Sequence, residues 1–197
     1  MKTTLTGVIL AGGQGSRMGG LDKGMMPLNG QPLVSWVLER MKPQVDEILI
    51  VANRNLDEYR ALGHPVVRDI RAGFLGPLAG LEAAMAAAHH NWILTCPVDA
   101  PLLCADYANR MLKESRGRPA VATLDGRMQP IYALLPRHAL TGLRAFLMAG
   151  GRKTSLWLES LAAVEVNFDD CPEAFLDVDT PEQLDELAQR VLNEGLV

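Results

Sequence analysis

The sequence predicts a single α/β domain built around a mostly parallel β-sheet. Short apolar runs of strand type alternate with amphipathic helical stretches along the whole chain. The strand-type runs are almost continuously apolar, as expected when helices cover both faces of a sheet. A length of 197 residues fits one domain of ordinary size, and no internal repeat divides the chain.

The first elements show the alternation clearly. Thr6–Leu10 (TGVIL) is a predicted strand because this apolar run stops at a glycine-rich segment. Pro32–Met41 is a predicted helix with proline in its first turn and apolar residues along one side. Ile48–Ala52 (ILIVA) is a predicted buried strand, and Val66–Val67 begins another short one.

The middle of the chain continues the pattern. Leu78–Ala88 is alanine-rich and predicts a helix. Trp92–Cys96 (WILTC) predicts a strand that ends at a proline. We expect a helix at Ala105–Lys113 and a strand at Ala120–Thr123.

The last third adds two predicted strands and three predicted helices. Ile131–Leu135 is a strand candidate, and the helices Leu140–Ala149 and Thr154–Leu161 are separated by a Gly-Gly pair. Phe175–Val178 is the last predicted strand. Residues 180–183 (TPEQ) place threonine at an N-cap, proline in the first turn and glutamine three residues on, which predicts the start of a terminal helix.

Composition excludes several classes of protein. The net charge is −4 and the pI about 5.6, whereas a protein that binds a nucleic-acid backbone usually carries a basic surplus. No apolar run approaches the ~20 residues needed to cross a bilayer. The three cysteines, Cys96, Cys104 and Cys171, have unrelated spacings. We therefore expect reduced thiols and a cytoplasmic location, with neither nucleic acid nor membrane as a partner.

A glycine-rich loop follows the first predicted strand. The segment Leu10–Lys23 reads LAGGQGSRMGGLDK, with five glycines and the cations Arg17 and Lys23. Glycines allow backbone amides to approach a polyphosphate closely, while arginine and lysine neutralise its charge. The loop therefore predicts a phosphate-binding site.

This loop is neither of two familiar phosphate-binding motifs. A Walker A loop requires Gly-Lys followed by serine or threonine, but Lys23 lies between Asp22 and Gly24. A dinucleotide fingerprint requires GxGxxG, but counting from Gly13 the sixth residue is Met18. Serine hydrolase chemistry is also unsupported, because no serine lies in a nucleophile elbow.

Polar residues follow the later predicted strands. Asp99 lies in CPVDAP just after WILTC, Asn53 follows ILIVA, and Asp69 follows Val66–Val67. Ligands of open α/β sheets bind at the carboxyl ends of the strands. A carboxylate there can hold Mg²⁺, which in turn bridges phosphate oxygens.

These motifs resemble those of the molybdenum cofactor guanylyltransferases, the MobA family of nucleotidyltransferases. LAGGQGSRMGGLDKG resembles the signature of the larger nucleotidyltransferase group. The ordered set is specific to the family and continues through most of the chain. It includes NGQPL, VANRN, GPLAG, CPVDAP, QPIYALL, GGRK and AFLDVDTPEQL. The resemblance implies a three-layer Rossmann-like fold and a single domain, residues 1–197, with a GTP-binding N-terminal half and a molybdopterin-binding C-terminal half.

The resemblance also implies roles for residues of the first half. Arg17 and Lys23 match residues that neutralise the triphosphate, and Asp99 matches the Mg²⁺ ligand. Asn53 and Asp69 match positions near the nucleoside. The backbone that holds the guanine nucleotide is matched by Leu10, Ala11, Gly12 and Gly13.

Some family positions differ here. Many relatives have asparagine where this chain has Val51, and the final motif commonly has asparagine at the positions of Asp177 and Asp179. Carboxylates repel an anionic pterin phosphate and donate no hydrogen bonds when ionised. Arg152 and Lys153 fall in the half where that phosphate is expected to bind.

The implied reaction is in-line attack of the molybdopterin phosphate on the α-phosphorus of GTP, with release of pyrophosphate. It needs positioning and charge neutralisation rather than a strong base. Transient contacts with cofactor-biosynthesis proteins or apo-molybdoenzymes follow from the same resemblance. Three alternatives remain: a cytidylyltransferase, against which Gly12 argues, a sugar-1-phosphate nucleotidyltransferase, and a protein that binds the nucleotide without catalysis.

Overall fold

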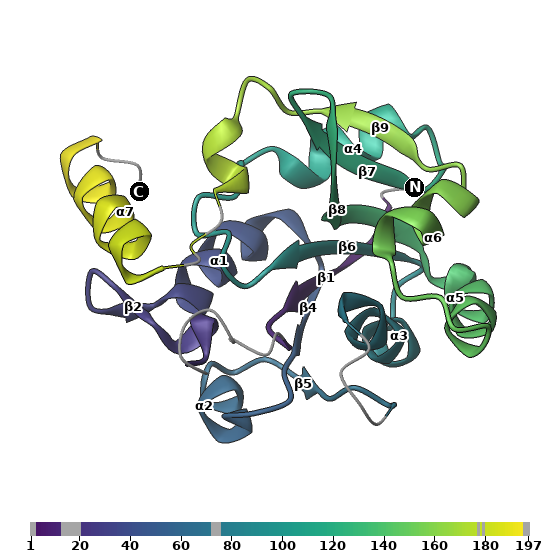
Figure 1. Ribbon diagram of the computed structural model, residues 1–197, viewed down its shortest axis with the longest axis horizontal. Helices are drawn as coiled ribbons and strands as arrows, with labels where there is room; N and C mark the ends of the chain where they lie inside the picture. Colours follow the sequence, from purple (N-terminus) through teal and green to yellow (C-terminus); the bar gives the residue numbers. More distant parts are fainter. Residues whose placement is uncertain (1–2, 13–20, 72–75, 177, 179, 195–197) are drawn as a thin grey trace.

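The computed structural model describes residues 3–12, 21–71, 76–176, 178 and 180–194. These residues form three layers, with one central β-sheet between two groups of helices (Figure 1). This arrangement confirms the three-layer α/β fold that the sequence predicts. Within the described residues, no helix is long and apolar enough to cross a membrane.

The central sheet has seven strands in the order β5-β4-β1-β6-β8-β7-β9 among the described residues. Strand β8 runs antiparallel to both of its neighbours, and the remaining pairs are parallel. The strands are β1 (Leu5–Leu10), β4 (Glu47–Val51), β5 (Val66–Val67), β6 (Trp92–Pro97), β7 (Ala120–Leu124), β8 (Arg127–Pro136) and β9 (Val164–Asn167). A separate hairpin is formed by β2 (Pro27–Leu28) and β3 (Gln31–Pro32).

Helices α1 to α6 contribute apolar side chains to the cores on the two faces of the sheet, whereas α7 packs elsewhere. The helices are α1 (Leu33–Met41), α2 (Leu56–Ala61), α3 (Pro77–Ala87), α4 (Tyr107–Ser115), α5 (Leu140–Met148), α6 (Thr154–Ser160) and α7 (Pro181–Glu194). Short 3-10 helices are η2 (Lys23–Met25), η3 (Lys42–Gln44), η4 (Arg137–Ala139) and η5 (Pro172–Phe175).

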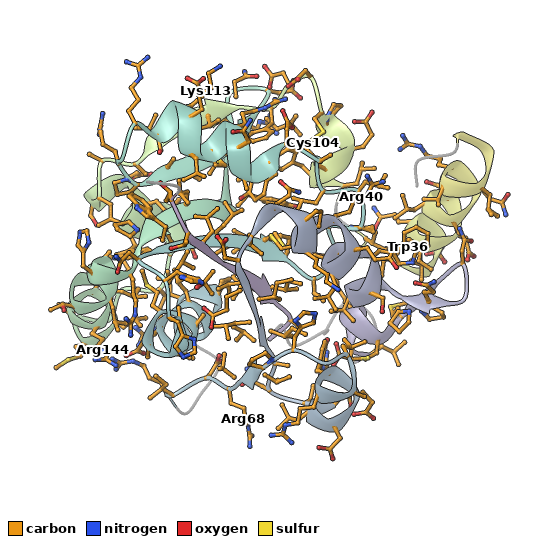
Figure 2. The ribbon with its side chains drawn as sticks, turned by 180° about the vertical axis from the view of Figure 1, so that it is seen from behind. Trp36, Arg40, Arg68, Cys104, Lys113 and Arg144 are labelled. Atoms are coloured by element: carbon orange, nitrogen blue, oxygen red, sulfur yellow. A yellow bond between two sulfur atoms is a disulfide. The ribbon has the colours of Figure 1, made fainter. Side chains whose placement is uncertain are left out.

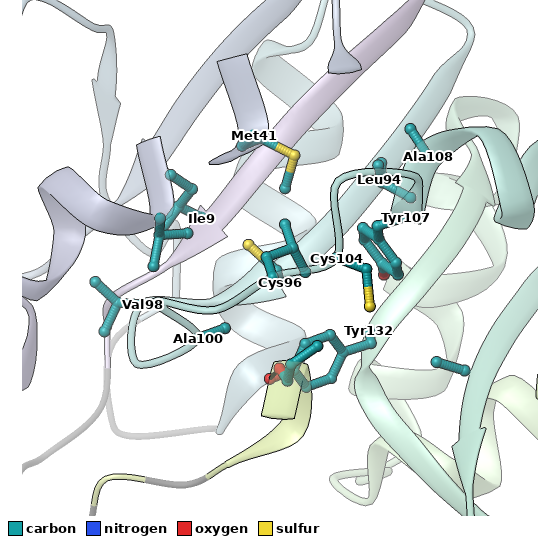
Figure 3. Close-up of a cluster of buried hydrophobic side chains, with 14 of the residues drawn as sticks. Ile9, Met41, Leu94, Cys96, Val98, Ala100, Cys104, Tyr107, Ala108 and Tyr132 are labelled. Atoms are coloured by element: carbon teal, nitrogen blue, oxygen red, sulfur yellow. Dashed lines mark hydrogen bonds between the residues drawn. The ribbon is translucent and has the colours of Figure 1, made fainter. Parts of the chain in front are cut away.

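Two hydrophobic cores lie on opposite faces of the sheet. One joins the sheet to α1, α2, α4 and η5, and Figure 3 shows part of it, where Met41 of α1 and Tyr107 of α4 approach strand β6. The other joins the sheet to α3, α5 and α6, with Trp157 fully enclosed. Both faces of the sheet are therefore covered by apolar side chains, which explains why the central strands lack an alternation of polar and apolar residues.

The terminal helix α7 belongs to a third, smaller core. Its apolar side packs against the β2–β3 hairpin and against Trp36 of α1, which lies between α1 and α7 (Figure 2). The predicted cap is confirmed: Gln183 N donates to Thr180 Oγ1 over 3.3 Å, and Thr180 N donates to Gln183 Oε1 over 3.0 Å.

One sequence expectation about local structure was wrong, and strand β9 and helix α2 were not predicted. The segment Phe175–Val178 contains no described strand, because Phe175 ends η5 and its ring enters the first core while Val178 enters the third. Strand β9 was not predicted, since its alternating sequence VEVN lies at the sheet edge and is only partly buried. Helix α2 was also missed, because six residues are too few to show a helical period.

The expectation of three reduced thiols is contradicted. Cys104 and Cys171 are joined by a disulfide, while Cys96 is a buried free thiol. The two bonded cysteines are 67 residues apart in sequence, and only the fold brings η5 beside the segment before α4. Sequence spacing alone cannot reveal such a pair.

Candidate active site

The candidate site lies where the strand order of the sheet reverses. Strand β1 has β4 on one side and β6 on the other, so the connections leaving the two sides of β1 diverge. Open α/β sheets usually bind their ligands in the crevice outside the carboxyl ends of the strands at such a reversal. Ala11 N donates to Val51 O over 2.8 Å and Val98 N donates to Leu10 O over 3.1 Å. The segments after β1, β4 and β6 are therefore held together.

Lys23 and Asp99 meet in this crevice. Lys23 Nζ lies 3.0 Å from Asp99 Oδ2, and the two side chains are 22% and 12% exposed. Lys23 begins η2 after the glycine-rich segment, and Asp99 lies in the turn after β6. Two residues 76 positions apart in sequence thus form one partly shielded ion pair.

Asn53 and Asp69 form a second pair beside the first. Asn53 Nδ2 donates to Asp69 Oδ2 over 3.0 Å, and Asp69 N donates to Asn53 Oδ1 over 3.1 Å. Burial raises the pKa of Asp69, while the hydrogen bond from Asn53 acts in the opposite direction. The other carboxyl oxygen, Asp69 Oδ1, is buried with no hydrogen-bond partner among the described residues. It is an acceptor available to a ligand.

Two glycines allow the loops of this site to approach closely. A Cβ at Gly12 would lie 3.1 Å from Asn53 Nδ2, closer than nearly all ordinary contacts. A Cβ at Gly80, in α3, would lie 2.8 Å from Val51 Cγ1 and 3.4 Å from Asp69 Oδ1. A larger residue at Gly12 would press on Asn53, and one at Gly80 would press on Val51.

Comparison with known proteins identifies the family. A sequence model of the MobA-like NTP transferase domain matches residues 7–164. A molybdenum cofactor guanylyltransferase from Shewanella piezotolerans is 42% identical over 197 residues, covering 98% of this chain and 97% of that protein. The chain belongs to the MobA-like NTP transferase family. The resemblance seen in the sequence motifs is thereby confirmed, and family membership makes the chain a nucleotidyltransferase.

Solved structures share the fold of this MobA-like chain. The crystal structure of molybdopterin-guanine dinucleotide biosynthesis protein A from Archaeoglobus fulgidus has a TM-score of 0.77 at 24% identity, covering 96% of this chain and 99% of that one. A Mycobacterium tuberculosis H37Rv protein, crystallised in complex with manganese, has a TM-score of 0.69 at 20% identity, covering 96% and 100%. At these identities the likeness concerns the fold.

Several expected positions of the MobA-like site lie outside the described residues. Gly13 and Arg17 belong to the undescribed part of the glycine-rich segment, and Asp177 and Asp179 belong to the final motif. The contacts given above bring together the expected positions that are described, namely Leu10, Ala11, Gly12, Lys23, Asn53, Asp69 and Asp99.

Arg152 and Lys153, in the half expected to bind the pterin phosphate, have different surroundings. Arg152 Nη1 donates to Leu147 O over 3.0 Å and to Gly151 O over 2.6 Å. Leu147 lies in the last turn of α5 and Gly151 in the link between α5 and α6, so the guanidinium binds carbonyls that are close to it in the chain. Lys153 is exposed at the N-cap of α6. The described contacts give Arg152 a local structural role.

The donor set of the MobA-like site suits a metal that binds mainly through its substrate. Among the described residues, no group of three or more His, Cys, Asp or Glu side chains could enclose a metal ion. Mg²⁺ usually binds through one or two carboxylates together with phosphate oxygens and water. The carboxylate of Asp99, 12% exposed and facing the crevice beside Lys23, fits that pattern.

Sequence reasoning missed two acidic side chains around this site. Asp22 is buried immediately before Lys23 and binds the side chains of Asn55, just before α2, and Tyr59, within α2. Glu82 of α3 is also buried and pairs with Arg71 and Arg144. An acidic residue inside an otherwise phosphate-binding loop was the available signal for Asp22, since it would repel the ligand unless its side chain turned inward.

Proposed function

We propose that this chain transfers GMP from GTP to the phosphate of molybdopterin, releasing pyrophosphate and forming molybdopterin guanine dinucleotide. Support comes from relatives with this named activity at 42% identity over nearly the full length. The observation that carries the proposal is the contact between Lys23 and Asp99 at the carboxyl edge of the sheet. This contact supports the proposal, because a cation and a carboxylate suited to a metal lie within reach of one triphosphate.

The proposed reaction is a single in-line displacement. An oxygen of the molybdopterin phosphate forms a bond to the α-phosphorus of GTP, and the bond from that phosphorus to the bridging oxygen breaks as pyrophosphate leaves. The attacking group is already anionic, so no general base is required. Lys23 and Arg17 neutralise charge on the departing pyrophosphate, and catalysis arises mainly from positioning and electrostatics.

The nucleoside is assigned to the neighbouring pair. In this proposal the backbone of Leu10, Ala11, Gly12 and Gly13 holds the nucleotide while Asn53 and Asp69 contact the nucleoside. Guanine carries N–H donors, and Asp69 Oδ1 is a buried acceptor that lacks a partner among the described residues. Gly12 permits the close approach of the first loop to Asn53. Cytosine also carries an N–H donor, so the preference for GTP over CTP rests on Gly12, which the family resemblance associates with guanine.

We assign the divalent cation as Mg²⁺ held by Asp99. When bound, it would neutralise phosphate charge and orient the triphosphate. Lys23 lies against the same carboxylate at 3.0 Å and balances its charge. We expect Lys23 to exchange Asp99 for phosphate oxygens when the nucleotide binds. The manganese complex of the M. tuberculosis protein with the same fold supports a divalent cation in this architecture.

Three further assignments complete the proposal. The chain acts as one domain, with GTP bound by its N-terminal half and molybdopterin by its C-terminal half. We also assign its place of action to the cytoplasm. The chain makes transient contacts with cofactor-biosynthesis proteins or apo-molybdoenzymes that supply or receive the pterin.

Pyrophosphate release tests the proposed function. The purified chain is incubated with each of the four NTPs, with and without molybdopterin, and with Mg²⁺ present or chelated. We expect release only with GTP, molybdopterin and the metal together. Release with CTP in place of GTP would identify a cytidylyltransferase, and GTP binding without release would identify a nucleotide-binding protein.

A further inference from the structure

A buried carboxylate lies directly before the lysine of the site. Asp22 has an 8% exposed fraction, although the neighbouring Lys23 faces the crevice. Asp22 Oδ1 accepts hydrogen bonds from Tyr59 Oη over 2.7 Å and from Gly24 N over 3.2 Å, and Asp22 Oδ2 accepts from Asn55 Nδ2 over 3.0 Å. We propose that Asp22 and Tyr59 form a buried support that positions Lys23 for nucleotidyl transfer, an inference that rests on the proposed function.

The support joins two segments that are distant in sequence. Tyr59 lies in α2, and Asn55 is the residue before that helix, whereas Asp22 ends the glycine-rich segment. Arg54 adds a third link, because its Nη2 donates to Leu21 O over 2.7 Å and its Nε lies 3.7 Å from Asp22 Oδ2. Side chains of the VANRN motif therefore hold the backbone on the N-terminal side of Lys23.

Asp22 also organises the backbone that carries Lys23. It is the N-cap of η2, where its side chain accepts from Gly24 N. Lys23 is the first residue of η2, so the bonds that fix Asp22 and Gly24 restrain the backbone of Lys23 from both sides. The long lysine side chain then needs to order only its own rotamers to reach Asp99.

The fit around Gly24 shows how tightly this support is packed. A Cβ on Gly24 would lie 2.3 Å from Tyr59 Oη and 2.7 Å from Val98 Cγ2. The chain therefore passes between the Tyr59 hydroxyl and the residue next to Asp99. The support consequently fixes η2 against the very turn that carries the metal-binding carboxylate.

The chemistry of Tyr59 suits it to this role. Its side chain is fully buried, and burial together with the hydrogen bond to Asp22 raises its pKa well above the usual tyrosine range. Tyr59 thus stays protonated and donates to the carboxylate throughout the physiological range. Hydrogen bonds to a charged group are stronger than neutral ones, and a buried carboxylate that loses a donor is poorly satisfied.

A double-mutant cycle between Tyr59 and Lys23 tests the inference. Tyr59→Phe keeps the buried ring and removes only the donor to Asp22. We expect kcat/KM for GTP, measured by pyrophosphate release, to fall roughly 10- to 100-fold, since small misplacement of a catalytic group carries large rate losses. Lys23→Ala should cost about 100-fold. The double variant should fall within about two-fold of Lys23→Ala alone, because Tyr59 acts through Lys23.

Matched variants separate positioning from general stability. Tyr107 is also a fully buried tyrosine whose hydroxyl donates to a backbone carbonyl, Thr95 O, over 2.9 Å, but it lies in the core beneath β6 (Figure 3). Tyr107→Phe should leave kcat/KM within about two-fold of the wild type at a temperature where both are folded. Asn55→Gly removes another donor to Asp22 at a position with φ of 48°, which glycine adopts without strain, and should reproduce a smaller loss of the same kind.

The outcomes distinguish this inference from the proposed function. If the wild type is active and Tyr59→Phe has the same kcat/KM, the positioning role is overturned but the proposed function is not. Losses that multiply in the Tyr59→Phe, Lys23→Ala double variant would also overturn it, because they would indicate an effect on the fold that is independent of Lys23. If Tyr59→Phe does not fold, judged by its melting transition, Asn55→Gly takes its place in the cycle. A wild-type enzyme that releases no pyrophosphate would instead refute the proposed function.

Discussion

The two halves of the chain use their charged side chains differently. At the carboxyl ends of β1, β4 and β6, charged and polar groups from separate segments face one another, as Lys23 and Asp99 do. In the C-terminal half, Arg152 binds a carbonyl in the last turn of the preceding helix α5, and Arg110 pairs with Asp106 and Asp170 on the surface. In the first arrangement a ligand can replace the partner of each paired side chain, whereas the second arrangement stabilises local structure. Charge type alone therefore does not identify a binding residue; its partner does.

The largest expected effect comes from removing the carboxylate of the site. Asp99→Ala should lower metal-dependent pyrophosphate release about 1,000-fold, because the metal and Lys23 both lose their shared partner. The melting temperature should change little, which circular dichroism would verify. Asp99→Asn, which keeps the shape and removes the charge, should be similarly inactive. Normal metal-dependent turnover in either variant would show that Asp99 has no role in the active site.

A Glu82 variant tests whether the N-terminal half, which we propose binds GTP, needs its buried ion pairs for stability. Its carboxylate is 2% exposed and accepts from Arg71 Nε over 2.6 Å and Arg144 Nε over 3.2 Å. Glu82→Gln should lower the free energy of unfolding by about 2 kcal/mol, since both arginines lose a charged partner. Urea denaturation measures this, with the exposed Glu58→Gln as control. Equal stability of the two variants would contradict the structural role of the Glu82 cluster.

The same cluster should respond to pH. The hydrogen bond from Arg71 is the main cause that lowers the pKa of Glu82 below its usual value of 4.5, with further contribution from Arg144. A depressed folded-state pKa stabilises the fold above the unfolded value, and this stabilisation is lost as pH falls through the folded value. The stability gap between wild type and Glu82→Gln should therefore be constant near neutrality and shrink below about pH 4.5. Denaturation curves at several pH values would detect a gap that instead widens in acid.

The smallest expected effect concerns Arg152 in the C-terminal half. Arg152→Ala should cost about 1 kcal/mol of stability, because the carbonyls of Leu147 and Gly151 each lose a hydrogen bond. The KM for molybdopterin should stay within about two-fold. Lys153→Ala is the neighbouring control for stability. A ten-fold rise in KM for Arg152→Ala would mean that the guanidinium leaves the helix end to bind the pterin phosphate, and the contrast between the halves would fail.

Sequence alone determined the fold class and the edge of the sheet, at the carboxyl ends of the strands, where the candidate site residues lie. Runs such as TGVIL and ILIVA predict buried strands because both of their faces are apolar, and strand ends locate the loops that reach a ligand. The positions of Lys23, Asn53, Asp69 and Asp99 after predicted strands were therefore enough to group them as one site. Local signals also sufficed for the cap formed by Thr180 and Gln183, which are three residues apart.

Only the tertiary structure decided the contacts between residues far apart in sequence. Asp22 reads as a solvated loop residue until Tyr59, 37 positions later, is seen to bury and bind it. Cys104 and Cys171 likewise read as separate thiols until the fold brings them together. The physical reason is common to both: periodicity and strand ends specify which face or edge a residue occupies, but a partner is specified by packing between elements.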